Sequence, residues 1–509
     1  MDLKKNKTTI INKEILSIAF VVLSNILKTS LGPNGKKKLI YFHNTKLYIT
    51  KDSKILLNKM RFNKILYLYL DIFKNNYSPI KDGTISIIII SSFIIKNIQI
   101  SHNDKILFRQ NILAIKLNCK KTLNLIKIIS FYNYKNFNSK YLFWWLFCTA
   151  KTTLRTKIIN NDIFVLTKIC LIAAMRTKTK SNMNSIKMVL KPEGTIHETF
   201  IDDCIFIQTK YGISDDVYIE NARLSSYSML ACNIENVTTT KIYFNNYNLE
   251  KFILTEKEIL KKKCKNILNN GINFLFTNLL IKNILFEFFT KSFLMFIDNC
   301  NQMDVSCLRN FSLIYNNNLF AQSFTQITGS VKLIESITIS NYKYIIFEKI
   351  FPSSECTIII RGSTITYIKE ISLLIFRVIG NLIYVINDCR FLFSGCSTDF
   401  KILNYLINHI KYFQNSDKNK LAIFPLGIEH FLKTLFENSY LNYNSLSIKL
   451  LYMNMNYANK TVYDLFYKNF LSCDKIGLCE PSKLKEQIFI NSTELVEVIS
   501  RINFIIFNK

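Results

Sequence analysis

Helical periodicity at both ends of the chain, around a middle rich in short strand-like runs, constrains its fold most. Apolar side chains recur at helical spacing over residues 10–30 and 85–98, and helical patterns return from about residue 364 to about residue 470. From about residue 200 to 360 the chain shows short runs of β-branched and aromatic residues, with a helical stretch over 255–269. This pattern predicts a helical domain built from both chain ends, with a mixed α/β domain inserted between them.

The expected strands of the middle region are short. They cover residues 204–209, 228–232, 242–244, 273–277, 294–297, 337–340, 344–348 and 356–361. Two further strands, over 38–42 and 46–50, are expected to form a hairpin in the first domain. Since only 12 of the 509 residues are glycine and 6 are proline, most turns must be made by asparagine, aspartate and serine.

The charge balance is strongly basic. The chain has 66 lysines and arginines against 36 aspartates and glutamates, a net charge of +30 that can indicate nucleic acid or an acidic membrane as partner. The lysines are nevertheless spread along the whole chain, and the abundance of Ile, Asn, Lys, Phe and Tyr indicates an AT-rich genome. We therefore expect a solvated lysine-rich surface that binds neither nucleic acid nor membrane. The 13 cysteines include no Cys-x-x-Cys pair, which indicates reduced thiols inside a cell.

Two apolar stretches imitate membrane or targeting segments. Residues 15–27 follow a lysine-containing start, but Ser17 and Ser24 interrupt them and no small-residue cleavage site follows. Residues 371–386 are the strongest apolar segment, yet they are shorter than the roughly 20 residues of a membrane span and contain Arg377. Both stretches are expected to be buried helices of a soluble protein.

Three polar interruptions of the helical pattern are the candidate binding motifs. The first, Leu31-Gly32-Pro33-Asn34-Gly35, ends a helix; it is either a structural turn or a place where backbone N–H groups approach an anion. The others are Thr50-Lys51-Asp52 and Asp82-Gly83-Thr84. An aspartate before a glycine at a helix start can be a cap, or it can hold a hard cation beside phosphate oxygens. The sequence contains no Walker loop, G-x-x-x-x-G-K-[ST].

Taken together and in this order, these motifs resemble the nucleotide site of group II chaperonins. The resemblance rests on Lys28–Gly35, Lys46–Asp52 and Lys81–Ser86, and it continues collinearly through Cys356–Ser363, Phe393–Asp399, Leu435–Ser439, Gly477–Pro481 and Arg501–Ile506. The chain is therefore identified as a member of this family. Among the subunits of the eukaryotic cytosolic chaperonin it most resembles theta, with zeta as the second choice.

The resemblance implies a multi-domain fold of α plus α/β type. An equatorial ATP-binding domain comes from both chain ends, and a small intermediate domain connects it to a mixed α/β apical domain that binds substrate. The implied boundaries are 1–147 and 397–509 for the equatorial domain, 148–198 and 364–396 for the intermediate domain, and 199–363 for the apical domain. The implied assembly is a cytoplasmic double ring of paralogous subunits that assists unfolded proteins of the tubulin and actin class.

The resemblance also assigns roles to individual residues. Asp52 would orient the water that attacks ATP, and Asp82 would hold Mg²⁺. Glu480 would face the ribose, and Gly395 would lie at the nucleoside. The remaining expected contacts are Leu31, Gly32 and Pro33 with the nucleotide, and Gly83, Thr84 and Ser86 with its phosphates.

One departure from the family pattern bears on hydrolysis. The family places a catalytic aspartate on the helix that follows the strand ending in Arg361-Gly362-Ser363, and Arg377 stands at the aligned position. Residues 371–387 contain no acid. Glu370 is seven residues from Arg377, which is roughly 10 Å along a helix at about 1.5 Å per residue. Loss of a general base typically lowers a rate roughly 10²–10⁴-fold.

The sequence therefore predicts an ATP-binding subunit with weak or lost hydrolysis. The alternative is a decayed structural ring subunit that no longer binds nucleotide. Arg377 either grips the γ-phosphate as a charge-assisted fork or merely reaches from a buried helix to solvent. Smaller departures from the family pattern are Ser53, Lys81, Ile85, Ser394 and Cys396.

Overall fold

In the computed structural model of this protein, the chain divides into two compact units, one from residues 1–171 and 369–509 and the other from residues 172–368. The residues described are 9–41, 47–59, 82–100, 105–132, 139–157, 162–177, 186–208, 217–226, 271–277, 283–292, 294–298, 300–311, 328–339, 342–348, 355–453, 461–465, 468–472, 477–502 and 504–507, with isolated positions between 254 and 269. The predicted fold class, helical at both chain ends with a mixed middle, is confirmed.

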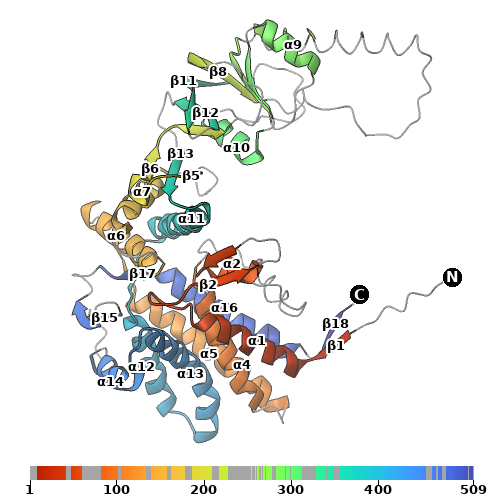
Figure 1. The fold of residues 1–509 in the computed structure, drawn as a ribbon. Coiled ribbons are helices and arrows are strands. Elements are labelled where there is room, and N and C mark those ends of the chain that lie inside the picture. The colour runs from red at the N-terminus through yellow and green to blue at the C-terminus, as the bar shows by residue number, and fades with distance from the viewer. Residues whose placement is uncertain are drawn as a thin grey trace, which may run out of the picture. The chain divides into compact units, whose positions relative to one another are not determined.

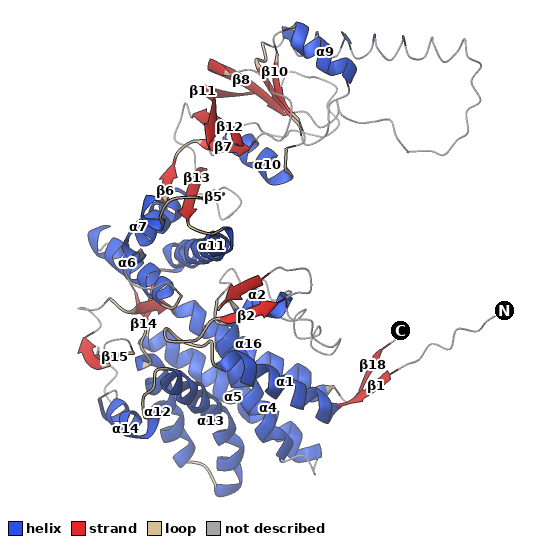
Figure 2. Cartoon of the chain, in the orientation of Figure 1, coloured by secondary structure: helices blue, strands red, loops and turns tan. Residues whose placement is uncertain are grey.

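The first unit is mainly helical, as Figure 2 shows. Its helices are α1 (Lys13–Lys28), α2 (Ser53–Lys59), α4 (Thr84–Ile100), α5 (Lys105–Ile129), α6 (Ser139–Arg155), α12 (Ser397–Lys411), α13 (Asn415–Asn438), α14 (Tyr443–Met453) and α16 (Ser482–Arg501). Two further helices, α7 (Ile163–Arg176) and α11 (Ile365–Asp388), begin in one unit and end in the other.

Short strands join distant parts of the first unit. They are β1 (Thr9–Asn12), β2 (Lys38–Tyr41), β3 (Leu47–Thr50), β4 (Phe131–Tyr132), β14 (Arg390–Phe393), β15 (Thr461–Asp464), β16 (Asn469–Ser472), β17 (Cys479–Pro481) and β18 (Phe504–Phe507). Strands β1 and β18 pair antiparallel, so the two chain ends run side by side (Figure 1). The predicted hairpin is confirmed as β2 and β3, and a second hairpin forms from β15 and β16. A three-stranded sheet has the order β17-β14-β4.

The helical predictions for this unit need two corrections. Residues 10–12 belong to β1 rather than to the first helix, because they pair with the carboxyl end of the chain. The helical interpretation of residues 364–470 is interrupted by β14 and β15, which are four-residue strands with buried apolar side chains. Such short apolar runs have the same composition as one turn of a buried helix, so periodicity alone does not separate them.

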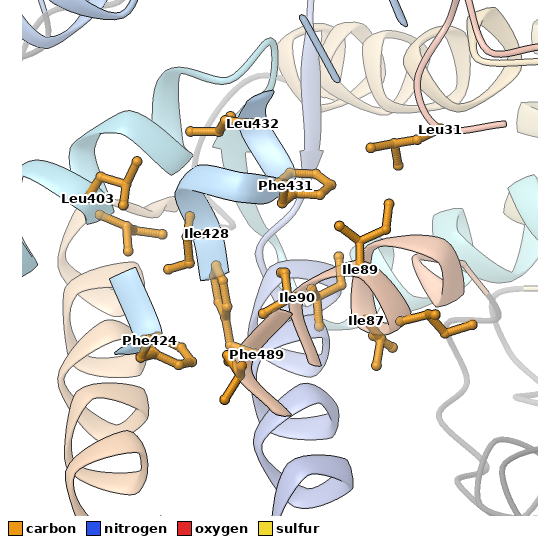
Figure 3. Close-up of a cluster of buried hydrophobic side chains, with 14 of the residues drawn as sticks. Leu31, Ile87, Ile89, Ile90, Leu403, Phe424, Ile428, Phe431, Leu432 and Phe489 are labelled. Carbon is orange, nitrogen blue, oxygen red and sulfur yellow. The ribbon is translucent and has the colours of Figure 1, made fainter. Parts of the chain in front are cut away.

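Helix α4 is the centre of the main hydrophobic core. Its buried residues include the consecutive run Ile87–Ile90, and an all-round apolar helix is stable in water only when neighbours cover every face. Helices α1, α13 and α16 pack against it. Figure 3 shows Phe424 and Ile428 of α13 and Phe489 of α16 in this cluster with Ile90. This core supports the loops that carry the predicted site, since Leu31 belongs to the same cluster.

The second unit is built on sheets. Its strands are β5 (Ile186–Pro192), β6 (Phe200–Asp202), β7 (Ile205–Gln208), β8 (Tyr218–Ser226), β9 (Phe274–Phe276), β10 (Met295–Ile297), β11 (Thr328–Ile339), β12 (Tyr342–Glu348) and β13 (Cys356–Gly362), and its helices are α9 (Asn283–Lys291), α10 (Gln302–Phe311) and the short η3 (Ile196–Glu198). A six-stranded sheet has the order β10-β9-β8-β11-β12-β7, and a three-stranded sheet has the order β5-β13-β6.

Most strand predictions for this unit are confirmed. The runs at 204–209, 273–277 and 294–297 contain β7, β9 and β10, and the runs at 344–348 and 356–361 form most of β12 and β13. The run at 337–340 is the end of the longer β11. The predicted strands at 228–232 and 242–244 lie outside the described residues, as does most of the predicted helix at 255–269.

The two apolar stretches behave differently. Among the described residues, α11 is the one helix that is long and apolar enough to cross a membrane, and 67% of its most apolar window is buried within the protein, as expected for a core helix. Helix α1, which was expected to be buried, buries only one of its faces. Phe20 is buried, whereas Ile15, Ile18 and Val22 are 51–61% exposed and form an apolar stripe on one helix face.

Candidate nucleotide-binding site

One cavity in the first unit, of about 260 Å³, brings together nine of the ten predicted site residues. Its lining includes Leu31, Gly32, Pro33, Asp82, Gly83, Thr84, Ser86, Gly395 and Glu480. These residues come from both ends of the chain. The tenth predicted residue, Asp52, is not among the lining residues, although its neighbours Lys51 and Ser53 are.

The Gly32 loop, residues 29–36, follows α1 and forms one wall. Gly32 has a φ of +80°, a conformation that favours glycine, and a Cβ there would lie 2.7 Å from Leu435 Cδ1. The amide of Asn438 donates hydrogen bonds to the carbonyls of Lys28, at 2.8 Å, and Leu31, at 3.0 Å. The Leu435–Ser439 motif therefore holds this loop in place from α13.

The N-terminus of α4 forms the side of the cavity that is expected to face phosphates. Gly83 has a φ of +83° and donates its N–H to Asp82 Oδ1 at 2.9 Å, and α4 begins at Thr84. The hydroxyls of Ser53 and Thr84 are hydrogen-bonded to each other beside it. The first N–H groups of a helix and its dipole favour an anion such as phosphate.

The residues present fit Mg²⁺ held jointly with phosphate. Among the described residues no group of three or more His, Cys, Asp or Glu side chains could hold a metal. Mg²⁺ usually takes one or two carboxylates and completes its shell with phosphate oxygens and water. Asp82, which lines the cavity at the start of α4, would supply that carboxylate.

Arg377 of α11 forms a buried ion pair with Asp52. Its Nη2 donates to Asp52 Oδ1 at 2.5 Å and also contacts Oδ2. The two side chains are 10% and 7% exposed, so the interpretation that Arg377 reaches solvent is wrong. Arg377 lines the cavity and Asp52 does not, so the cavity presents the guanidinium of this pair and not the carboxylate.

Lys157, just beyond the end of α6, adds a further positive charge to the lining. Burial lowers the pKa of its ammonium; nearby Asp82, Asp52 and Glu370 act in the opposite direction, and Arg377 reinforces the lowering. The residue therefore lies within electrostatic range of both predicted carboxylates. Glu370 itself is not among the lining residues.

A buried charge cluster forms the side expected to face the ribose. Lys485 Nζ donates to both carboxylate oxygens of Asp399 at 2.8 Å and lies 3.6 Å from Glu480 Oε1. Burial, together with the charge of Asp399, raises the pKa of Glu480 to about 7, although the charge of Lys485 opposes this shift. For Lys485, burial lowers the pKa, but the charges of Asp399 and Glu480 reverse the net direction and raise it.

The turn before α12 is tightly packed. Gly395 has a φ of +72°, and a Cβ there would lie 2.0 Å from Val462 Cγ1. The next residue, Cys396, adopts a φ of +66° although it is not glycine, and its side chain is buried. A non-glycine residue in this region is strained, so this departure from the family pattern is tolerated rather than favourable.

The sequence reasoning missed three groups that the structure brings to the cavity: the Asp399–Lys485 pair, Lys157, and Arg155 with Asp464, whose Nη1 and Oδ2 are 3.5 Å apart. Of these residues only Asp399 lies in a sequence motif that could have indicated it, since it ends the family-like segment Phe393–Asp399. The other residues stand outside any motif, and their partners are distant in the sequence.

Comparisons with known proteins show the family of the chain. The family model described as the TCP-1/cpn60 chaperonin family matches residues 23–509. The chain is 23% identical to T-complex protein 1 subunit beta of Arabidopsis thaliana, covering 96% of this chain and 93% of that protein. It is 21% identical to the subunits beta of Homo sapiens and Saccharomyces cerevisiae, covering 96% of this chain and 92% and 93% of those proteins.

Proposed function

The chain belongs to the TCP-1/cpn60 chaperonin family, and on that premise we propose that it is an ATP-binding subunit of a hetero-oligomeric chaperonin whose own hydrolysis is weak or lost. The observation that carries the proposal is a contrast within one cavity. Eight predicted nucleotide contacts and the predicted Mg²⁺ ligand Asp82 line it, while the predicted catalytic Asp52 is paired with Arg377.

Binding is supported by the charges of the lining. The phosphates would lie at the N-terminus of α4, contacted by Gly83, Thr84 and Ser86, and Lys157 would contribute attraction. Asp82 would hold Mg²⁺, which when bound neutralises part of the phosphate charge. Glu480 and Gly395 would contact the nucleoside end of the nucleotide.

Weak hydrolysis follows from the chemistry of Arg377. A guanidinium stays protonated at physiological pH and cannot accept a proton from water. Its ion pair also occupies Asp52, the carboxylate expected to orient that water. The second candidate function, a ring subunit that no longer binds nucleotide, is favoured only by the smaller departures from the family pattern, Ser53, Lys81, Ile85, Ser394 and Cys396.

Photoaffinity labelling separates the two functions. The native complex is purified, labelled with an azido-ATP probe in the presence of Mg²⁺, and probe attachment to this subunit is quantified by mass spectrometry. If this subunit is labelled and excess ATP prevents the labelling, nucleotide binding is supported. Labelling confined to neighbouring subunits would instead establish the structural role, with the neighbours serving as the internal positive control.

The proposed partners are paralogous subunits in a double ring and unfolded proteins of the tubulin and actin class, in the cytoplasm.

Assembly explains the apolar stripe of α1, since exposed apolar patches mark interaction surfaces. Ile18→Lys, at a position 61% exposed, should lower recovery of this subunit in the ring. Ile128→Lys on α5, 76% exposed, is the matched control and should assemble normally. Equal recovery of the two variants in a native-mass comparison would remove the stripe from the interface.

Two finer assignments stay predictions. The theta or zeta identity is not confirmed, because the relatives reported above are beta subunits. The five-segment division into equatorial, intermediate and apical domains is finer than the two compact units. We propose it as the working division of the chain.

A further inference from the structure

The side chain of Lys51 is buried in a cage of backbone carbonyls. The residue lies between β3 and α2 and is 6% exposed. Its Nζ donates hydrogen bonds to the carbonyl oxygens of Gly32 at 2.5 Å, Pro33 at 3.1 Å and Thr156 at 2.6 Å. The three acceptors belong to two segments: the Gly32 loop, and the turn that follows the end of α6.

We propose that Lys51 is a positioning residue for the nucleotide: its ammonium ties the Gly32 loop to the carboxyl end of α6 and thereby sets the affinity of the cavity. The inference rests on the proposed nucleotide binding, because Gly32 and Pro33 are expected nucleotide contacts. It adds a role for a residue that no expected contact with ATP or Mg²⁺ uses.

The chemistry of the cage requires a charged amine. An ammonium has three N–H donors, one for each carbonyl, whereas a neutral amine has two and leaves one carbonyl without its donor. Thr156 directly follows α6, and carbonyls at the end of a helix carry partial negative charge that favours a cation. Loss of the charge should therefore release the Gly32 loop from α6.

The surroundings of Lys51 lower its pKa, so that its ammonium loses its proton close to physiological pH. Burial, together with Lys157 and Lys37, lowers the pKa of Lys51 to about 8, and Glu370 acts in the opposite direction. Glu370 accepts a hydrogen bond from the Lys51 backbone N–H at 3.4 Å and pairs with Lys37 at 3.1 Å. On α6, Arg155 is paired with Asp464. The ammonium is thus intact at pH 7 and largely neutral at pH 9.

The test measures nucleotide affinity of this subunit within the purified complex. Azido-ATP labelling of the subunit is titrated at pH 7 and at pH 9 for the wild type, Lys51→Met and Lys433→Met. Lys433 pairs with Glu429 on the exposed side of α13 and is the matched control. We expect Lys51→Met to weaken binding about tenfold at pH 7, a loss equivalent to one charged hydrogen bond. Wild type and Lys433→Met should lose affinity between pH 7 and 9, while Lys51→Met should not.

Each outcome decides the inference. Equal affinity of Lys51→Met and wild type at pH 7, or the same pH profile in both, overturns the positioning role while leaving nucleotide binding in place. If the wild-type subunit is not labelled at pH 7 by probe that excess ATP displaces, both nucleotide binding and the positioning role are overturned. If Lys51→Met does not enter the complex, the wild-type profile decides, since affinity that is constant from pH 7 to 9 contradicts a titrating ammonium.

Discussion

Replacing Asp82 with alanine is expected to weaken binding of Mg–ATP to this subunit on the order of 100-fold, since a lost metal ligand costs several kcal/mol. Asp82 lines the cavity at the start of α4, where its carboxylate would complete a Mg²⁺ shell otherwise made of phosphate oxygens and water. The fold should be preserved, because the side chain is partly exposed and Gly83 keeps its left-handed turn.

The measurement is azido-ATP labelling of the subunit at increasing Mg²⁺ concentration. Wild-type labelling should rise with Mg²⁺, and Asp82→Ala labelling should respond weakly. Asp417→Ala provides the control, since Asp417 is 52% exposed and pairs with Lys420 on the surface. A Mg²⁺ dependence in Asp82→Ala identical to that of the wild type would place the metal on another residue.

Replacing Arg377 with aspartate is expected to raise single-turnover hydrolysis by this subunit roughly 10²-fold, the lower end of what a general base contributes. The change frees Asp52 from its ion pair and places a second carboxylate beside it. Two close carboxylates raise the pKa of one of them, which suits proton transfer from water. Ile85 and Ser394, which depart from the family pattern beside the site, limit the expected recovery.

Arg377→Lys and Arg377→Met separate the two effects of this change. The lysine variant keeps the positive charge, and the methionine variant releases Asp52 without adding a base. Both should remain inactive when hydrolysis is followed in rings where only this subunit carries an otherwise intact site. Turnover by the wild-type subunit comparable to that of an intact neighbour would show that another carboxylate serves as the base.

The sequence predicts where the site lies better than it predicts which side chains pair within it. Turns that require glycine at positive φ, such as Gly32 and Gly83, interrupt helical patterns and therefore mark the loops that meet at the cavity. The pairing of Asp52 with Arg377 joins residues 325 positions apart, and no local pattern reports it. The same holds for the carbonyl cage of Lys51, whose geometry depends on how α6 ends.

In the fold as well, features decided by local composition were predicted better than features decided by distant pairing partners. The apolar helix α4 lies within two residues of its expected bounds 85–98, because burial inside a core explains its composition. Helix α11 begins six residues before the expected apolar stretch 371–386. The four-residue strands β14 and β15 were missed, since their pairing partners and not their own residues decide their conformation.

The interleaving of the two chain ends in the first unit has a consequence for synthesis on the ribosome. Helix α4 ends at Ile100, but its packing partner α13 begins at Asn415 and α16 at Ser482. At roughly 5–20 residues per second, α4 waits on the order of tens of seconds before these neighbours leave the ribosome. Of the partners α1, α13 and α16, only α1 is already synthesised during that interval, and the isoleucines of α4 that pack against α13 and α16 lack these neighbours. A newly made copy of this chaperonin subunit is therefore itself an aggregation-prone nascent chain. It needs protection until translation is complete.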